Sequence, residues 1–137
     1  EGDRVHWLYQ QYATHHAIKE FTRLHEATDP DAADPRLRIN AYLSHGNALA
    51  YGIAAAAMWH LGLSAAYPLV HGLTRNGGLI FDAADLIKDT TVLPWAFDCY
   101  RMPTTRAMHE LRYRIKHQRG DVFIMDTLSR LAREVSE

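Results

Sequence analysis

The stretch from Leu37 to Leu61 constrains the fold of this chain more than any other part of the sequence. It is rich in Ala, Leu and Ile, and Gly46 and Gly52 lie inside its helical pattern. Because an interior glycine costs about 1 kcal/mol relative to alanine, both glycines predict close approach of another backbone. Its longest apolar part, residues 48–63, is shorter than the roughly 20 residues that a membrane span needs. We therefore expect a buried central helix, capped near Gly62, and no membrane partner.

The segments before this helix predict another helix followed by a loop. Apolar side chains at residues 5–16 recur at three- and four-residue steps, which gathers them on one helical face. We expect this first helix to end near Ala17. The stretch 28–35 holds two prolines and three acids without an apolar period, which is typical of a surface loop.

The second half of the chain begins with a segment that cannot be one regular helix. Residues 65–78 contain one proline and three glycines, which leaves room for a short hairpin near residues 70–80. A helical period returns through residues 81–91, so we expect a helix that starts near Asp82. Pro94 and Pro103 are then expected to break or kink the chain.

Two more helices are expected after these prolines. Thr104 or Thr105 is placed to cap a basic helix that ends near Gly120. Asp121 is placed to cap a last helix, whose apolar residues run to Leu131.

Length and composition favour one compact all-α domain over residues 1–137. A chain of 137 residues that is 47% hydrophobic can bury one core and is short for two ordinary domains. It begins at Glu1 inside a helical pattern and without methionine, which indicates a piece of a longer protein. The single cysteine, Cys99, excludes a disulfide framework and a cysteine-based zinc site, and it fits the reducing cytoplasm.

Charge is spread unevenly along the chain. Residues 1–100 hold 7 Lys+Arg against 11 Asp+Glu, a net of -4, whereas residues 101–137 hold 8 against 5, a net of +3. Within residues 101–119 the only acid is Glu110. The cations there are Arg101, Arg106, Arg112, Arg114, Lys116 and Arg119. This segment favours either a local nucleic-acid-binding face or an ordinary solvated helix face.

A stripe of carboxylates is the strongest candidate for a site. Asp82 and Asp85 are three residues apart and Asp89 is four further on, so on a helix the three repel one another. A divalent cation would offset this repulsion, and an added imidazole would favour manganese or another transition metal over magnesium; His71 is a candidate. The ordinary alternative is that these acids stabilise a helix N-terminus and that Lys88 pairs with Asp85. Spacing alone leaves both interpretations open.

Other candidate functions find less support in the sequence. Tyr9, Tyr12 and Trp59 fall at helical spacing, which favours places in the core over platforms for bases. The sequence contains no glycine-rich phosphate loop, no Gly-x-Ser-x-Gly elbow and no Cys-x-x-Cys pair. Nucleophilic serine chemistry is therefore not expected.

Three blocks of sequence carry a resemblance to a known family. They are Glu1-Gly-Asp-Arg-Val5 with Tyr9 and Tyr12, Asn40-Ala-Tyr-Leu-Ser-His-Gly-Asn47 with Leu49-Ala-Tyr-Gly52, and His71 through Lys88 followed by Leu93-Pro-Trp-Ala-Phe97. Together they resemble the C-terminal domain of the universal CRISPR adaptation integrase, the larger of the two spacer-acquisition subunits. The second and third blocks are most similar to the type I-F branch.

The resemblance implies a metal-dependent DNA endonuclease and integrase of helical fold. In this family a divalent metal, Mn²⁺ or Mg²⁺, would be bound by residues matching Glu1, His71 and Asp85, with Asp82 in support. A free DNA 3′-hydroxyl then attacks a phosphodiester at the edge of a repeat, while the metal polarises the phosphate. Basic residues would hold the phosphate backbone without reading sequence. They are Arg75, Arg101, Arg106, Arg112, Arg114 and Lys116.

The resemblance also implies partners. They are double-stranded DNA, as spacer precursor and as CRISPR repeat, a second copy of the full-length protein, and a small adaptation subunit, alone or fused to the effector helicase-nuclease. The N-terminal β-rich domain through which family members dimerise is absent from these 137 residues. The alternative is a non-catalytic helical module that binds DNA or protein through residues 101–119, and metal binding separates the two.

Overall fold

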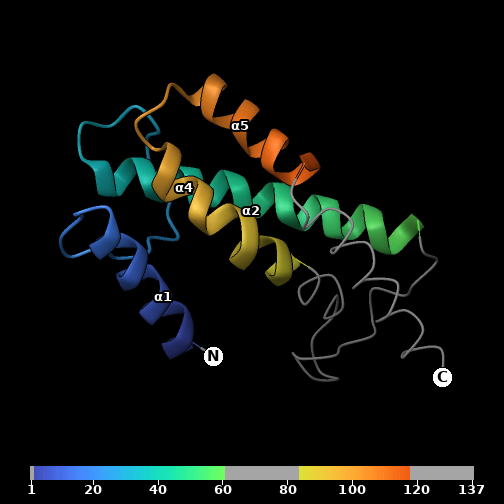
Figure 1. The fold of residues 1–137 in the computed structure, drawn as a ribbon, viewed down its shortest axis with the longest axis horizontal. Helices are drawn as coiled ribbons and strands as arrows, with labels where there is room; N and C mark the ends of the chain where they lie inside the picture. Colours follow the sequence, from blue (N-terminus) through green and yellow to red (C-terminus); the bar gives the residue numbers. More distant parts are fainter. Residues whose placement is uncertain (1, 61–83, 118–137) are drawn as a thin grey trace.

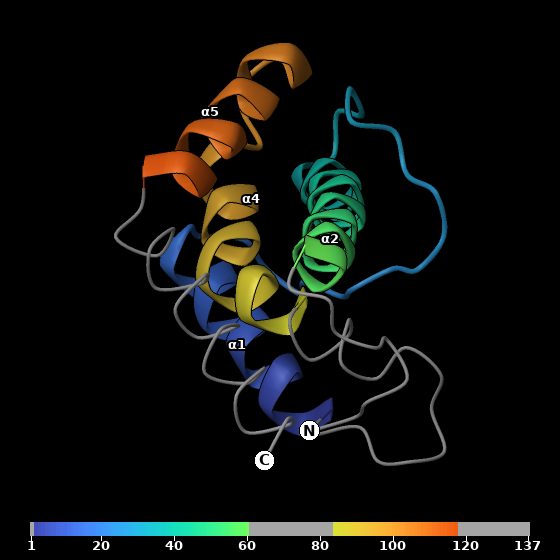
Figure 2. The same cartoon turned by 90° about the vertical axis from the view of Figure 1, so that its right-hand side faces the viewer.

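The computed structural model describes residues 2–60 and 84–117, and every regular element within these ranges is helical. The elements are α1 (Gly2–His15), α2 (Pro35–His60), the π-helix η1 (Lys88–Val92), α4 (Leu93–Cys99) and α5 (Thr104–His117). In Figure 1 the long helix α2 crosses the molecule, and α4 lies over it between α1 and α5. Figure 2 shows α2 on one side and α1, α4 and α5 on the other. The all-α prediction is confirmed for this part of the chain. The expected hairpin near residues 70–80 and the expected last helix lie outside the described residues.

The end of α1 follows from a tight backbone turn. The N–H of Ile18 donates to the Ala13 carbonyl at 2.8 Å, and the N–H of Ala17 donates to the Thr14 carbonyl at 3.1 Å. This is the Schellman pattern, in which the residue after the helix takes a left-handed conformation. Ala17 does so with φ of 58°, although it has a side chain that this conformation disfavours. The predicted end near Ala17 is confirmed.

The start of α2 combines two helix-initiating residues. Pro35 is its first residue, where the missing N–H is no loss, and the Asp34 carboxylate accepts a hydrogen bond from the Arg36 N–H at 2.9 Å. One face of α2 then buries Ile39, Leu43 and other apolar residues, so the predicted central helix is confirmed.

The two glycines inside α2 differ. A Cβ added to Gly46 would lie 3.2 Å from Trp95 Cζ3 and closer still to Val92 Cγ1, so Gly46 does have a close neighbour, but it is side chain and not the predicted backbone. A Cβ added to Gly52 would meet no atom of the described residues within 4 Å, so these residues supply no close neighbour there.

The sequence predicts that Pro94 breaks or kinks the chain, and the structure shows no break, because the helix continues through this proline. Residues 84–87 are α-helical, η1 follows without interruption, and Pro94 lies in the first turn of α4. The Leu93 N–H reaches the Lys88 carbonyl, five residues back, which is the hydrogen bond of a π-turn. Pro94 cannot donate to a carbonyl and its ring crowds the preceding turn. The wider π-turn accommodates the ring without ending the helix.

Trp95 of α4 is at the centre of the core. Its side chain is fully buried, stacks on Tyr42 of α2 with ring centroids 5.3 Å apart, and donates its indole N–H to the Ala107 carbonyl of α5 at 2.7 Å. Tyr12 of α1 stacks on Phe97 at 5.8 Å. Tyr9 and Tyr12 both pack against the core, as predicted. Trp59, near the end of α2, is 88% exposed, so its predicted place in the core is wrong.

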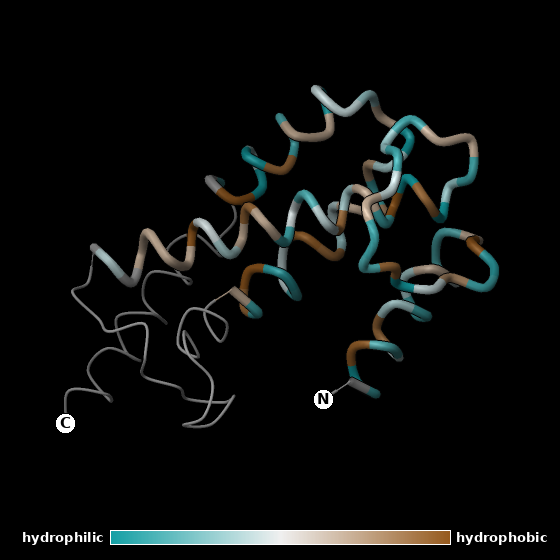
Figure 3. The backbone as a smooth tube through the Cα atoms, turned by 180° about the vertical axis from the view of Figure 1, so that it is seen from behind, coloured by the Kyte–Doolittle hydropathy of each residue, from teal (hydrophilic) through white to brown (hydrophobic). Residues whose placement is uncertain are grey.

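The basic helix starts where the sequence predicts, with a different cap. The Ala107 N–H donates to the Pro103 carbonyl at 2.9 Å, and Thr104 is already the first residue of α5. Within the described ranges the Thr104 hydroxyl is buried without a hydrogen-bond partner, so it does not cap the helix. Figure 3 shows hydrophobic and hydrophilic residues alternating along α5, as expected for a helix with one buried face. Among the described helices, none has the length and apolar character of a membrane span.

Candidate active-site pocket

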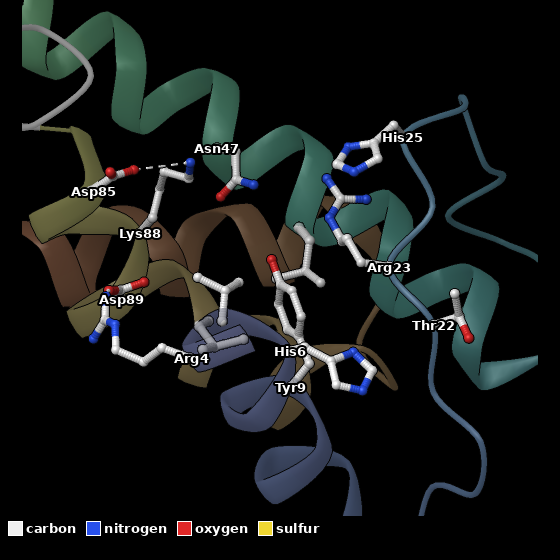
Figure 4. A pocket seen from close by; sticks show the side chains of 13 residues that line it. Arg4, His6, Tyr9, Thr22, Arg23, His25, Asn47, Asp85, Lys88 and Asp89 are labelled. Carbon is white, nitrogen blue, oxygen red and sulfur yellow. Dashed lines mark hydrogen bonds and ion pairs between the residues drawn. The ribbon is translucent and has the colours of Figure 1, made fainter. Parts of the chain in front are cut away.

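A pocket of about 640 Å³ lies between α1, the loop that follows it, α2 and the helical segment that begins at residue 84. Figure 4 shows its labelled side chains: Asp85, Lys88 and Asp89 lie at one end, and Arg23 and His25 at the other. The lining residues are Arg4, Val5, His6, Tyr9, Thr22, Arg23, His25, Leu43, Asn47, Asp85, Lys88, Asp89 and Leu93.

Cations neutralise the acidic end of the pocket. The Lys88 ammonium lies 3.2 Å from the Asp85 carboxylate, and Arg4 of α1 donates to the Asp89 carboxylate at 2.8 Å. The Lys88 pair is the one that the ordinary interpretation of the carboxylate stripe predicted. The Arg4 pair links the first turns of α1 to the helix that carries Asp85. Both pairs are partly exposed, so each contributes on the order of 0–1 kcal/mol to stability.

A buried asparagine organises the opposite wall. Asn40 of α2 accepts a hydrogen bond from the Leu24 N–H at 2.7 Å and donates to the Thr22 carbonyl at 2.9 Å. It thereby fixes the irregular segment between α1 and α2 against the core. The Arg23 guanidinium is held by neutral oxygens: Asn40 Oδ1 and Ser44 Oγ, each at 3.1 Å, and the Leu24 carbonyl. Its positive charge therefore remains available to an anion in the pocket.

Tyr9 forms part of the floor between the two ends. Burial raises the pKa of its phenol, and the nearby charge of Arg23 opposes part of that rise. Tyr9 is therefore a neutral phenol at neutral pH, able to donate a hydrogen bond.

Only one member of the predicted metal site can be placed. Glu1, His71 and Asp82 lie outside the described residues, as does Arg75, whereas Asp85 faces the pocket. Within the described ranges no group of three or more His, Cys, Asp or Glu side chains could hold a metal ion. The Asp85 carboxylate is partly exposed and supplies the hard oxygen that Mg²⁺ and Mn²⁺ prefer. It therefore suits one position of a metal site.

The predicted DNA-binding cations differ in their surroundings. Arg106 and Arg112 are exposed on α5, and Arg101 is exposed beside Tyr100, to whose hydroxyl its Nε donates at 2.9 Å. Arg114 instead pairs with two carboxylates, Asp98 of α4 at 2.9 Å and Glu110 at 3.1 Å. Lys116 lies in the last turns of α5.

Sequence reasoning did not select Arg23 and the polar groups of the far wall. Arg23 and His25 come from a segment without a periodic pattern. The position of the Arg23 side chain depends on a hydrogen bond to Asn40, 17 residues later in the sequence. Asn40 and Asn47 do lie in the second block that carried the family resemblance. These two asparagines within one apolar helix were the signal that could have indicated the far wall, because a buried amide usually forms several hydrogen bonds.

Comparisons with known proteins agree on one group of relatives. The CRISPR-associated endonuclease Cas1 of Pectobacterium atrosepticum is 48% identical over 90 residues, 66% of this chain and 26% of the relative. That of Pseudomonas aeruginosa is 50% identical over 78 residues, 57% of this chain and 22% of the relative. That of Escherichia coli is 30% identical over 112 residues, 82% of this chain and 35% of the relative.

A solved structure extends the similarity to the fold. The crystal structure of a TtCas1–DNA complex matches with a TM-score of 0.74 and 30% identity, covering 97% of this chain and 51% of that chain. No protein-family model matches the chain. The matched segment spans about a quarter of the length of the first two relatives.

Proposed function

This chain belongs to the Cas1 family of CRISPR-associated endonucleases, and from that premise we propose that residues 1–137 form the helical catalytic domain of a DNA integrase. The reaction is the insertion of spacer DNA into a CRISPR array, by attack of a DNA 3′-hydroxyl on a repeat phosphodiester. The observation that carries the proposal is the pocket, where Asp85 lies at one end and Arg23, held by neutral oxygens, at the other (Figure 4), in a chain whose relatives are endonucleases.

We propose that Glu1, His71 and Asp85 bind one divalent ion, Mn²⁺ or Mg²⁺, with Asp82 beside them. The arrangement of the helices supports the first and third of these. Figures 1 and 2 show α1 and the helix from residue 84 running side by side in the same general direction, and Arg4 pairs with Asp89. The first turns of α1 therefore lie beside the helix that carries Asp85, and Glu1 directly precedes Gly2 in the sequence.

The side chains of the pocket divide the work on DNA. A divalent ion bound there would polarise the scissile phosphodiester and stabilise the charge that develops on it. Arg23, held in place by neutral oxygens, is oriented to receive a backbone phosphate. Lys88 lies beside Asp85 at the acidic end of the pocket (Figure 4), where its ammonium group can pair with Asp85 or with a phosphate.

We also propose that six cations hold the DNA backbone without reading its sequence. They are Arg75, Arg101, Arg106, Arg112, Arg114 and Lys116. The solved TtCas1 structure is a complex with DNA, which supports this assignment. The partners that we propose are double-stranded DNA, a second copy of the full-length protein, and a small CRISPR adaptation subunit, alone or fused to the effector helicase-nuclease.

The test compares Asp85→Asn with Asp89→Asn in the full encoded protein. Both changes remove a pocket carboxylate that pairs with a cation, but only Asp85 is a proposed ligand. We expect millimolar Mn²⁺ to raise the melting temperature of the wild type and of Asp89→Asn and to leave Asp85→Asn unchanged. Strand transfer should follow the same pattern. An Asp85→Asn protein that keeps both its Mn²⁺ response and its strand transfer would overturn the metal assignment.

A non-catalytic helical module is the second candidate function, and the Asp85–Lys88 pair favours it. If that pair is only structural, the carboxylate stripe needs no metal. Asp85→Asn would then change the melting temperature slightly and equally with and without Mn²⁺, while DNA or protein binding through residues 101–119 would persist.

A further inference from the structure

An ion pair joins the start of α1 to the helix that carries Asp85. The Arg4 guanidinium donates to the Asp89 carboxylate at 2.8 Å, across 85 positions of sequence, and Figure 4 shows both side chains at the acidic end of the pocket. The two side chains are 61% and 33% exposed. We call this contact the Arg4–Asp89 bridge. Its place in the two helices, more than its strength, distinguishes it from an ordinary surface ion pair.

Each partner of the bridge follows a proposed metal ligand by three or four residues in the sequence. Asp89 is four residues after Asp85, and Arg4 is three residues after Glu1. In a helix such steps return to the same face, roughly 5 Å further along the axis. Figures 1 and 2 show α1 and the helix from residue 84 side by side. The bridge therefore joins the two helices next to the place where we propose that the metal binds.

The two halves of α1 differ in how firmly the core holds them. In the second half, Ala13 is buried and Tyr12 stacks on Phe97 of α4 at 5.8 Å. In the first half, residues 3, 4, 6 and 7 are exposed. A helix that is packed at one end can tilt at the other, because few buried contacts oppose the movement there. The Arg4–Asp89 bridge thus acts on the part of α1 whose position packing determines least.

We propose that the bridge between Arg4 and Asp89 is a positioning pair, which holds the start of α1 at the distance from Asp85 that metal binding requires. The inference rests on the proposed function and deepens it, because it gives a role to two charged residues that do not bind the metal themselves. Groups around a metal site commonly orient its ligands through hydrogen bonds in this way, and their loss weakens metal binding.

The alternative is that the bridge acts on a metal ion only through its charges. Removal of Arg4 would then strengthen the binding of a nearby cation, and removal of Asp89 would weaken it, because like charges repel and opposite charges attract. A positioning pair predicts weaker binding in both cases, since either change releases the start of α1. The sign of the Arg4 effect therefore separates the two explanations.

The test measures the affinity of the full encoded protein for Mn²⁺ alone, from the loss of the electron paramagnetic resonance signal of the free ion, at a temperature where every variant is folded. Arg4→Ala and Asp89→Leu should each weaken Mn²⁺ binding about three- to tenfold, because the pair is partly exposed. The double variant Arg4→Asp with Asp89→Arg restores an ion pair and should recover most of the affinity. Asp89→Asn should stay close to the wild type, because its amide oxygen still accepts a hydrogen bond from Arg4.

Arg36→Ala is the matched control. Arg36 pairs with Asp34 at 3.0 Å in another partly exposed ion pair, but it lies at the start of α2 and does not line the pocket. This change should leave the Mn²⁺ affinity as it is. Unchanged or tighter Mn²⁺ binding in Arg4→Ala overturns the inference, and so does a double variant that binds no better than the single ones.

Asp85→Asn, measured in the same assay, distinguishes failure of the positioning role from failure of the metal assignment. If Asp85→Asn loses Mn²⁺ binding while Arg4→Ala keeps it in full, the metal assignment stands and the positioning role is wrong. If Asp85→Asn binds Mn²⁺ like the wild type, both are wrong.

Discussion

Gly46 and Gly52 look alike in the sequence of α2, but the structure separates them. A side chain at Gly46 would run into Val92 and Trp95 of the adjacent helix, whereas no described atom faces Gly52. We expect Gly46→Ala to lower the free energy of unfolding by about 1–3 kcal/mol through overpacking. Gly52→Ala should raise it by up to about 1 kcal/mol, because alanine restricts the unfolded chain and favours the helix. Urea denaturation of the two variants checks both signs.

If both glycine variants shift stability in the same direction, the contact at Gly46 does not limit the packing of α2. The sequence could not distinguish the two positions. A glycine in a helical pattern indicates a loss of helix stability, but it does not show which residue packs against it. The same limit explains Trp59. Its spacing matched that of core residues, but the end of α2 extends past the helices that would cover it among the described residues.

At the scale of elements, the charge of the Asp34 carboxylate makes the stability of the start of α2 depend on pH. Hydrogen bonds from the side chain and then the backbone of Arg36 lower the pKa of the Asp34 carboxyl. A lowered folded pKa stabilises the protein above the unfolded value, about 3.9, and this stability is lost as pH falls through the folded pKa.

We therefore expect Asp34→Ala to lower the melting temperature at neutral pH, with the difference from wild type shrinking in acid. Asp34→Asn caps helices nearly as well but does not titrate, so it should stay close to wild type at neutral pH. Melting curves from pH 7 to pH 2 test this. A deficit of Asp34→Ala that is constant over the whole range would mean that the carboxylate charge is irrelevant.

Arg112 and Arg114 are neighbours in α5 with different surroundings, and we expect them to separate in experiment. Arg114 joins α5 to Asp98 of α4, so Arg114→Ala should destabilise the fold by about 0.5–2 kcal/mol. Arg112 is exposed, so Arg112→Ala should leave stability within about 0.5 kcal/mol.

DNA binding should show the reverse order. Loss of Arg112 should reduce affinity for all sequences and flatten the salt dependence, while loss of Arg114 should have the smaller effect. Filter binding over a salt series provides the measurement. A larger binding loss for Arg114→Ala, with unchanged stability, would show that DNA displaces its carboxylate partners. In the sequence both arginines belong to one basic segment. Only the structure shows that Asp98 pairs with Arg114.

Helix periodicity predicted the described elements well and their junctions less well. The end of α1 and the start of α5 lie where the sequence predicts, although Thr104 does not cap α5. The π-turn before Pro94 does not follow from propensity, since a proline in a helical pattern usually predicts a break. Ile87 and Val92 before Pro94 and Trp95 and Phe97 after it are buried, so core packing keeps the helix continuous.

At the scale of the whole molecule, the sequence identified the acidic end of the pocket and missed its opposite wall. Asp85 and Asp89 are four residues apart, so their shared face follows from helical spacing. Arg23 reaches the pocket only because Asn40 fixes the segment after α1 against α2. Such tertiary hydrogen bonds leave no periodic signal. The acidic end of the pocket is therefore formed by side chains of a single helix, whereas the opposite wall depends on tertiary contacts between distant segments.

Trp95 is the residue on which the three-helix arrangement depends most, because it contacts α2 through Tyr42 and α5 through the Ala107 carbonyl. Trp95→Phe keeps an aromatic ring but removes the indole N–H and part of the buried area. We expect it to lower the free energy of unfolding by about 2–4 kcal/mol, from a lost hydrogen bond and the space left behind. Amides of α5 should also exchange faster with solvent, since the helix loses its bond to α4.

Trp59→Phe is the control for this change, because Trp59 is 88% exposed and its replacement removes no core contact. It should stay within about 0.5 kcal/mol of the wild type. Urea denaturation gives the free energies, and hydrogen exchange gives the response of each helix. If Trp95→Phe unfolds at the wild-type urea concentration, Tyr42 and the apolar face of α5 hold the helices together without the indole bond. If it is destabilised while α5 exchanges as before, the loss comes from packing against α2 alone. Faster exchange confined to α5 would show that the bond between Trp95 and Ala107 holds the proposed DNA-binding helix against α4.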